Sequence, residues 1–131
     1  MLNKFINIFT KPESLNKIKT PDNINVIFKL HFKDLTIGYL SLNNGKWNFK
    51  YSTEFINQDL VKPLINFPDK LKEYNSEDLW PFFISRLPGL DRPEIKAQIK
   101  KNNIDEENEV ELLNLFGKKS ISNPFILELQ S

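Results

Sequence analysis

Residues 24–51 read INVIFKLHFKDLTIGYLSLNNGKWNFKY and decide the fold of this chain. Apolar and polar residues alternate along 24–32, which is the period-2 pattern of a half-buried strand. A second strand is expected over 35–42, after a turn at Lys33-Asp34. The Asn-Asn-Gly sequence at 43–45 is a strong hairpin signal, because Asn and Gly accept the positive φ that tight turns require. The segment therefore predicts a three-stranded antiparallel meander.

The third strand of this meander separates aromatic from basic side chains. Trp47, Phe49 and Tyr51 face one way, and the lysines at 46 and 50 face the other. Interleaved aromatic and basic residues also occur in proteins that bind single-stranded nucleic acid. A stacking platform, however, needs both kinds of side chain on the exposed face. We therefore interpret the three rings as core. In the second strand, Gly38 indicates a bulge or a close backbone approach.

Helices are expected after the meander. Ser52 is placed to cap a short helix over 53–60, and two prolines make 61–68 extended. Three further helices are expected, the first over 77–87 with Ser76 as its cap. The second covers 92–101, with Asp91 and Glu94 at capping-box spacing, and the third covers 106–116 and is stopped by Gly117. Residues 125–129 read as a closing strand that can rejoin the sheet.

These elements predict one α+β domain over residues 24–131, preceded by an N-terminal arm over 1–23. The antiparallel β meander packs on a C-terminal group of about three to four helices, and the closing strand ends the chain. The arm has apolar residues at helical spacing between Leu2 and Phe9, followed by proline breaks. Whether the arm docks on its own domain or on a neighbouring molecule stays open at this stage.

Composition excludes several kinds of site. The chain has 131 residues, no Cys and one His, His31, so disulfides, thiolate metal sites and His-cluster sites are excluded. We interpret His31 as a surface or hydrogen-bonded strand residue. The four glycines lie too far apart for a phosphate-binding loop. We therefore expect no cofactor, no metal and no catalysis.

Charge and hydropathy limit the partners and the location. A net charge of +1 is too balanced for a generic binder of polyanions. The acidic run at 105–111 lacks the ligand pattern of a calcium loop, and we interpret it as a solvated helix face. No apolar stretch approaches the ~20 residues of a membrane span, and the first residues make a poor signal peptide. We expect a cytoplasmic protein with no membrane or direct nucleic-acid contact.

Trp80 is the most distinctive candidate for a binding residue. Leu79, Phe82 and Phe83 fall on the core-facing side of the expected helix, and Trp80 lies beside them at its start. Tryptophan at such a position is often core. A partly exposed tryptophan at a rigid helix start is also a good interface anchor. With the neighbouring residues Glu77, Asp78 and Pro81, Trp80 forms our candidate binding site.

A set of short motifs occurs along the chain in a fixed order: Ile37-Gly38-Tyr39-Leu40, Phe49-x-Tyr51, Pro63-Leu64, Phe67-Pro68, Phe82-Phe83, Leu87-Pro88, Leu112-Leu113, Phe116-Gly117 and the closing strand Phe125–Leu129. With these motifs the chain resembles the N-terminal subdomain of HipA-type serine/threonine kinase toxins. It resembles still more the HipS-type antitoxins, the small free-standing proteins of three-part HipB–HipS–HipT toxin–antitoxin systems. The order and spacing of the motifs cover roughly 100 residues. Two places depart from the family pattern: Ser85-Arg86, and the loop Lys118–Phe125.

The resemblance implies an antitoxin that binds a HipT-like kinase toxin while a HipB-like protein binds operator DNA, in a ternary complex. It would neutralise the kinase either by plugging the active site or by holding the kinase lobes in an inactive arrangement. Glu77, Asp78, Trp80 and Pro81 would then be the toxin-binding turn. The alternative is a stand-alone module of the same fold that binds nucleic acid or a peptide. An enzyme is the least favoured possibility, because the nucleotide-binding parts of a kinase are missing.

Overall fold

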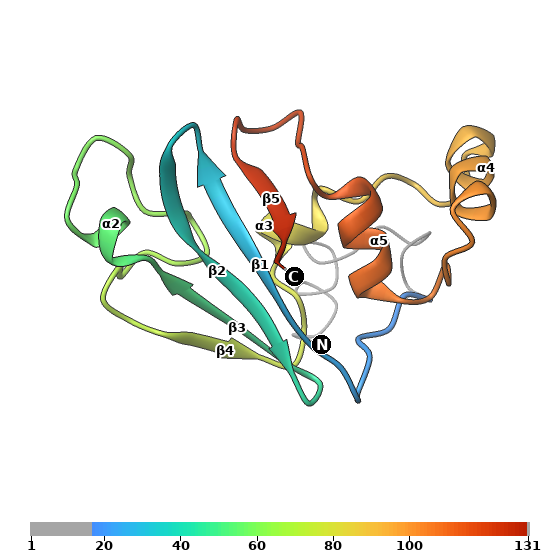
Figure 1. Cartoon of the computed structure of the whole chain (residues 1–131), viewed down its shortest axis with the longest axis horizontal. Helices are drawn as coiled ribbons and strands as arrows, with labels where there is room; N and C mark the ends of the chain where they lie inside the picture. Colours follow the sequence, from blue (N-terminus) through green and yellow to red (C-terminus); the bar gives the residue numbers. More distant parts are fainter. Residues whose placement is uncertain (1–16, 131) are drawn as a thin grey trace, which may run out of the picture.

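A five-stranded antiparallel sheet organises the chain in this computed structural model, which describes residues 17–130 (Figure 1). The strands lie in the order β4-β3-β2-β1-β5. The elements in chain order are β1 (Asn25–Phe32), β2 (Leu35–Asn43), β3 (Lys46–Tyr51), α2 (Thr53–Ile56), β4 (Tyr74–Ser76), α3 (Pro81–Ile84), α4 (Pro93–Lys101), α5 (Glu109–Phe116) and β5 (Ile126–Leu129). The expected α+β architecture is confirmed, including the closing strand, which pairs with β1.

The predicted meander is confirmed together with its turns. The β2–β3 hairpin turns at Asn44 and Gly45, with φ values of 51° and 80°, and Lys33 takes a φ of 53° between β1 and β2. The register between β1 and β2 shifts between Leu30 and His31 of β1. Ile37 of β2 is the extra residue of the bulge at this point. The neighbouring Gly38 lies so close to β3 that an added Cβ would stand 2.6 Å from the Lys50 carbonyl oxygen. The close backbone approach predicted at Gly38 is therefore confirmed, and the predicted bulge lies at the preceding residue.

One face of the sheet carries the core. Trp47, Phe49 and Tyr51 of β3 are buried as predicted, whereas Lys46 and Lys50 of the same strand are exposed. The Phe49 ring stacks on Phe67 with 4.2 Å between ring centroids and also meets Phe83. Figure 1 shows α3 behind the sheet, on this aromatic face. The core is thus a layer of rings between the meander and the segments that follow it.

The expected helix over 77–87 is wrong in extent. Residues 74–76 form the edge strand β4, and Ser76 pairs with Trp47 of β3 instead of capping a helix. The Ser76 hydroxyl accepts a hydrogen bond from the Asp78 amide at 3.0 Å, which makes a local turn. Trp80 precedes a proline and is extended, with φ −71° and ψ 151°, so the helix begins only at Pro81.

The other helices are confirmed with changed ends. Ser52 caps α2 as predicted, since its hydroxyl accepts from the Phe55 amide, but α2 has four residues rather than eight. α4 begins at Pro93, one residue later than expected, and the predicted Asp91–Glu94 capping box is wrong, because Arg92 is the N-cap and Glu94 accepts from Arg92. α5 starts later than predicted, with Asn108 as its cap, and ends before Gly117 as predicted.

Candidate protein-interaction site

The four residues of the candidate site lie together in the turn between β4 and α3. Glu77, Asp78 and Pro81 are exposed, and Trp80 is half-buried. The Trp80 ring packs edge-on against the buried Phe67 ring, with 4.9 Å between centroids and 77° between ring planes. Trp80 therefore has one side packed against the core and another side exposed to solvent.

Hydrogen bonds fasten the end of this Trp80 turn, residues 77–81, to its surroundings. The Trp80 carbonyl accepts from the amides of Phe83 and Ile84 at 3.0 and 3.1 Å. The side-chain oxygen of Asn66 accepts from the Phe82 amide at 2.9 Å, which ties the start of α3 to the loop before β4. Such a preorganised aromatic side chain loses little entropy on binding.

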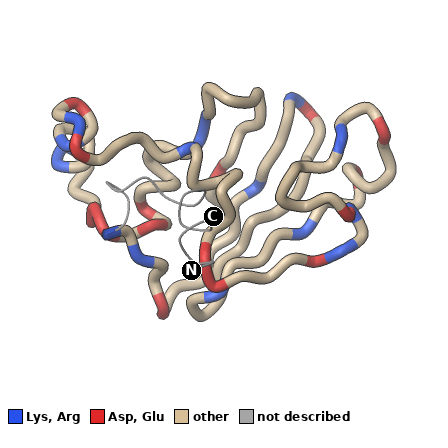
Figure 2. The backbone as a smooth tube through the Cα atoms, turned by 180° about the vertical axis from the view of Figure 1, so that it is seen from behind, with Lys and Arg blue, Asp and Glu red and all other residues tan. Residues whose placement is uncertain are grey.

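The acidic residues of the turn border a polar hollow beside the β2–β3 hairpin. Glu77 and Asp78 share this hollow with Asp22, and the lysines at 19 and 46 also line it. Figure 2 likewise shows basic and acidic positions interspersed along the backbone. The turn therefore presents carboxylates among lysines, not a purely acidic patch. Within residues 17–130, no group of three or more potential ligands is placed to hold a metal ion.

Glu109 is a buried carboxylate that the sequence analysis missed. We expected the acidic run at 105–111 to be a solvated face, but Glu109 is 0% exposed. Its Oε1 accepts from Trp47 Nε1 at 3.1 Å and from Thr20 Oγ1 at 2.7 Å. The available signal was Trp47 itself, because a buried indole N–H needs an acceptor.

The described end of the N-terminal arm packs on its own domain. The Lys19 amide donates to the Glu107 carbonyl at 2.7 Å, and the Lys19 carbonyl accepts from the Glu109 amide at 3.1 Å. Ile18 is buried beside them. For residues 17–20 the open question is thus answered in favour of intramolecular docking. The helix predicted between Leu2 and Phe9 lies outside the described residues.

Arg86 links the two places where the sequence departs from the family pattern. Its buried guanidinium donates to the carbonyls of Gly117 at 2.6 Å and Lys118 at 3.0 Å, and also to that of Phe125. Burial lowers the pKa of Arg86 to about 10, so the group stays charged at neutral pH. Arg86 therefore fastens both ends of the 118–125 loop to the turn that follows α3.

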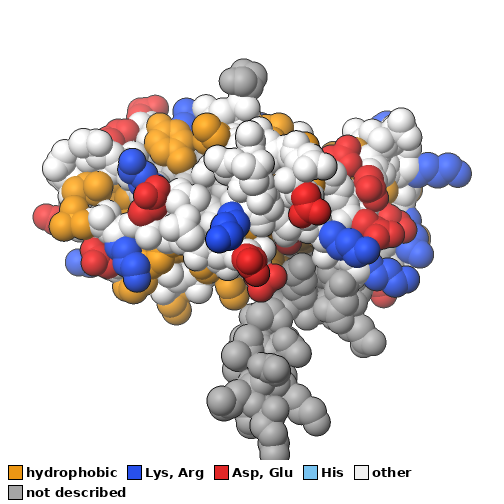
Figure 3. Space-filling view, turned by 90° about the horizontal axis from the view of Figure 1, so that it is seen from below, with side chains coloured by type: hydrophobic (Ala, Val, Ile, Leu, Met, Phe, Trp, Pro, Cys, Tyr) orange, Lys and Arg blue, Asp and Glu red, His pale blue; other side chains and the backbone are white. Residues whose placement is uncertain are grey.

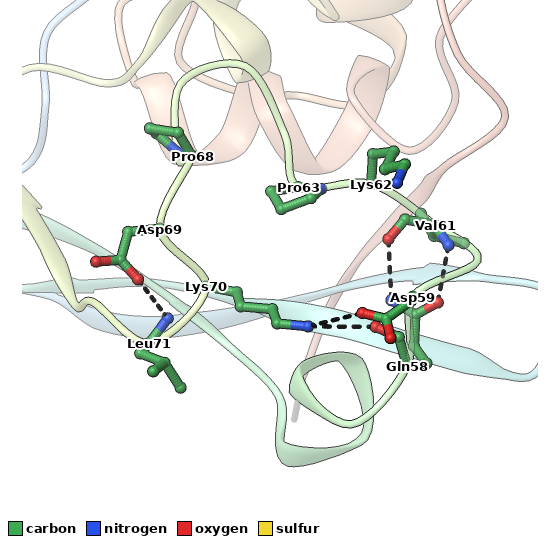
Figure 4. Close-up of a pocket in the computed structure, with 9 residues that line it drawn as sticks. All are labelled: Gln58, Asp59, Val61, Lys62, Pro63, Pro68, Asp69, Lys70 and Leu71. Atoms are coloured by element: carbon green, nitrogen blue, oxygen red, sulfur yellow. Dashed lines mark hydrogen bonds and ion pairs between the residues drawn. The ribbon is translucent and has the colours of Figure 1, made fainter.

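The long loop between α2 and β4, residues 57–73, has no helix, and within it the segment 61–68 is non-helical as its two prolines predicted. Its unpredicted feature is a set of exposed aliphatic side chains: Leu60, Ile65 and Leu71. Figure 3 shows hydrophobic side chains gathered at the end of the molecule that carries α2 and this loop. The two limbs of the loop enclose a hollow, drawn in Figure 4.

His31 is a hydrogen-bonded strand residue, as interpreted from the sequence. Its Nε2 lies 2.5 Å from Glu128 Oε1 of the neighbouring strand β5. This hydrogen bond from His31 holds the pKa of Glu128 below its usual value. The pair joins β1 to β5 on the outer face of the sheet, so His31 has a structural role. Among residues 17–130, no helix has both the length and the apolar character needed to cross a bilayer.

Comparison with known proteins gives one family. The sequence model of the HipA N-terminal domain matches residues 28–121. The match begins in β1 and ends after α5, so it includes the meander, the 57–73 loop and the Trp80 turn. A comparison with curated proteins found no match.

Proposed function

Because the chain belongs to the HipA N-terminal domain family, and is thereby a HipA-related component of toxin–antitoxin systems, we propose that it is an antitoxin. It neutralises a HipT-like serine/threonine kinase toxin by direct protein–protein binding. The observation that supports the proposal is the match to the HipA N-terminal domain. It extends over residues 28–121 of a 131-residue chain.

The proposed antitoxin acts without catalysis and without a cofactor. A kinase needs a phosphate-binding loop, a phosphate-binding lysine and Mg²⁺-binding groups. The four glycines of this chain are too widely spaced for such a loop. Addition of ATP and Mg²⁺ should therefore leave the melting temperature of the purified protein unchanged. A clear upward shift would show nucleotide binding and contradict this part of the proposal.

The Trp80 turn is the proposed toxin-binding site. A kinase's nucleotide pocket has apolar walls and basic groups that hold phosphates. A half-exposed indole beside Glu77 and Asp78 offers such a pocket an apolar group for its walls and carboxylates for its basic groups. The turn either enters the active site or contacts it closely enough to hold the kinase lobes in an inactive arrangement.

The proposed setting is a cytoplasmic complex of three proteins. A HipB-like protein binds operator DNA, the kinase is the toxin, and this chain binds the kinase. A short kinase gene and a small helix-turn-helix gene beside this one would support that arrangement. The functional test is co-expression: the chain should restore growth of cells that express the kinase. Continued growth arrest, with both proteins present at comparable levels, would contradict the proposal.

One observation favours a second candidate function, a nucleic-acid-binding module. Lys46 and Lys50 are exposed on the outer face of the sheet, and Tyr39, which pairs with Lys50, is 40% exposed on the same face. Lysines beside an exposed ring suit single strands. This function predicts salt-dependent binding of a labelled oligonucleotide that is weakened in Lys50→Glu. The antitoxin proposal predicts that the same variant still neutralises the kinase.

A further inference from the structure

The 57–73 loop concentrates exposed aliphatic side chains. Leu60 is 96% exposed, Ile65 88% and Leu71 79%. Among residues 17–130, the only other large aliphatic side chain with comparable exposure is Ile121. Single exposed apolar residues are common on proteins, but three in one loop, here together called the patch, make this loop a candidate contact surface.

The loop is held in place from both sides, so the exposure is built into the fold. At its base, the buried Tyr51 hydroxyl donates to the Phe67 carbonyl at 2.6 Å and accepts from the Leu64 amide at 2.8 Å. Burial raises the pKa of Tyr51 to about 12, so the hydroxyl keeps the proton that it donates.

A second set of bonds joins the two limbs of the loop. Lys70 Nζ reaches Asp59 Oδ1 at 3.3 Å and the Gln58 carbonyl at 3.4 Å across the hollow (Figure 4). The Gln58 side chain also bonds both backbone groups of Val61. A loop fixed in this way binds at a lower entropic cost than a mobile one.

The hollow between the limbs shows what chemistry the partner needs. It has a volume of about 560 Å³, and its apolar lining comes from Val61, Pro63, Pro68 and Leu71. The charged residues around it are mixed in sign, with Asp59 and Asp69 against Lys62 and Lys70. Nucleic acid binding requires a predominantly positive surface. A surface with an apolar lining and charges of both signs instead suits a protein partner.

The size and position of the patch indicate which kind of protein binds there. Three aliphatic side chains offer roughly 100 Å² each, well short of the ~800 Å² per partner in a stable interface. The patch is therefore too small for a dimer of its own. The loop that carries it lies against α3 and the Trp80 turn, because the Asn66 side chain accepts from the Phe82 amide and the Phe67 ring packs edge-on against Trp80.

We propose that the 57–73 loop is a second contact surface for the kinase toxin, on which Leu60, Ile65 and Leu71 enter an apolar depression beside the site that Trp80 reaches. This inference rests on the proposed function. Because the 57–73 loop and the Trp80 turn contact each other, the kinase binds to both of them at neighbouring positions.

The test compares two variants of the full chain for binding to the purified kinase by calorimetric titration. Leu60→Asp/Ile65→Asp/Leu71→Asp should bind at least 30-fold more weakly than the natural chain. Ile121→Asp, which changes an equally exposed residue outside the loop, should bind within twofold of it. Both variants should melt like the natural chain, because the changed side chains are exposed. Should the triple variant not fold, Leu60→Asp carries the test, with an expected loss of at least fivefold.

Three results would overturn the inference. Undiminished kinase binding by the folded triple variant would remove the loop from the interface and leave the proposed function intact. A natural chain that sediments as a dimer, with a monomeric triple variant that still binds the kinase fully, would assign the loop to a second copy. Absence of kinase binding by the natural chain would overturn the proposed function and this inference together.

Discussion

Near α5 the molecule buries two charged side chains, Arg86 and Glu109, whereas at the other end the 57–73 loop exposes three aliphatic ones (Figure 1). The buried charges are used within the chain: Arg86 binds the carbonyls of the 117–125 segment, and Glu109 accepts from Trp47 and Thr20. The exposed aliphatics have no comparable use inside the domain. The first region therefore serves the fold, and the second is available to a partner.

The largest expected effect comes from the aromatic layer that both regions share. Phe83 is fully buried and meets Phe49, Phe67 and Phe82. Phe83→Ala should lower the free energy of unfolding by about 3–5 kcal/mol, measured by denaturant titration. Such a loss would unfold much of a marginally stable domain. A variant as stable as the natural chain would show that the packing of α3 on the sheet is misplaced.

Breaking the buried-charge region should cost nearly as much. Arg86→Met removes the donors of three carbonyl groups and should lower the free energy of unfolding by about 3 kcal/mol. Arg86→Lys keeps the charge but loses the forked geometry, so it should recover only part of that loss. Equal stability of Arg86→Met and the natural chain would contradict the role given to this residue. Toxin binding by the folded fraction should change little in either variant.

The Trp80 turn should show the opposite pattern. Trp80→Ala should leave the isolated protein folded and weaken kinase binding by about 2 kcal/mol or more, and co-expression should no longer restore growth. Trp80→Phe keeps a ring against Phe67 and should lose less. Unfolding of Trp80→Ala would assign Trp80 to the core alone. Full neutralisation by the folded variant would place the contact elsewhere.

The smallest expected effect concerns how the exposed loop is held. Tyr51→Phe removes the hydroxyl that bonds Leu64 and Phe67 and should cost about 1–2 kcal/mol of stability. Amide hydrogen exchange should speed up at Leu64 more than in β2, because the loop loses its anchor while the sheet keeps its ladder. Equal exchange at Leu64 in both proteins would show that the loop is fixed by other contacts.

Local patterns explain why the meander could be predicted. The alternation along β1 and β3 and the Asn-Gly turn act over a few residues, and so does Ser52 as the cap of α2. β4 could not be predicted, because its three residues become a strand only through pairing with β3. The burial of Glu109 depends on Trp47, 62 positions away in the sequence. The acidic run at 105–111 was therefore predicted to be solvated, because nothing in the run itself indicates this partner.

The placement of the candidate site's residues was predicted in part, and their binding role stays a prediction. The spacing placed Trp80 beside the core residues Leu79 and Phe83, which matches its half-buried position against Phe67. Pro81 is the first residue of α3, and a proline disfavours the helical conformation at the residue before it, here Trp80. This rule for proline places the start of the helix at Pro81 rather than at residue 77. The exposure of Leu60, Ile65 and Leu71 depends on the path of a loop and has no signature in the sequence.

The central claim, neutralisation by direct binding, is tested most directly by one measurement on purified proteins. Autophosphorylation of the HipT-like kinase is followed as the chain is added. The account predicts that phosphate incorporation falls as the complex forms and reaches background when the chain is in saturating excess. Autophosphorylation that stays at its initial rate across the whole titration would contradict the account.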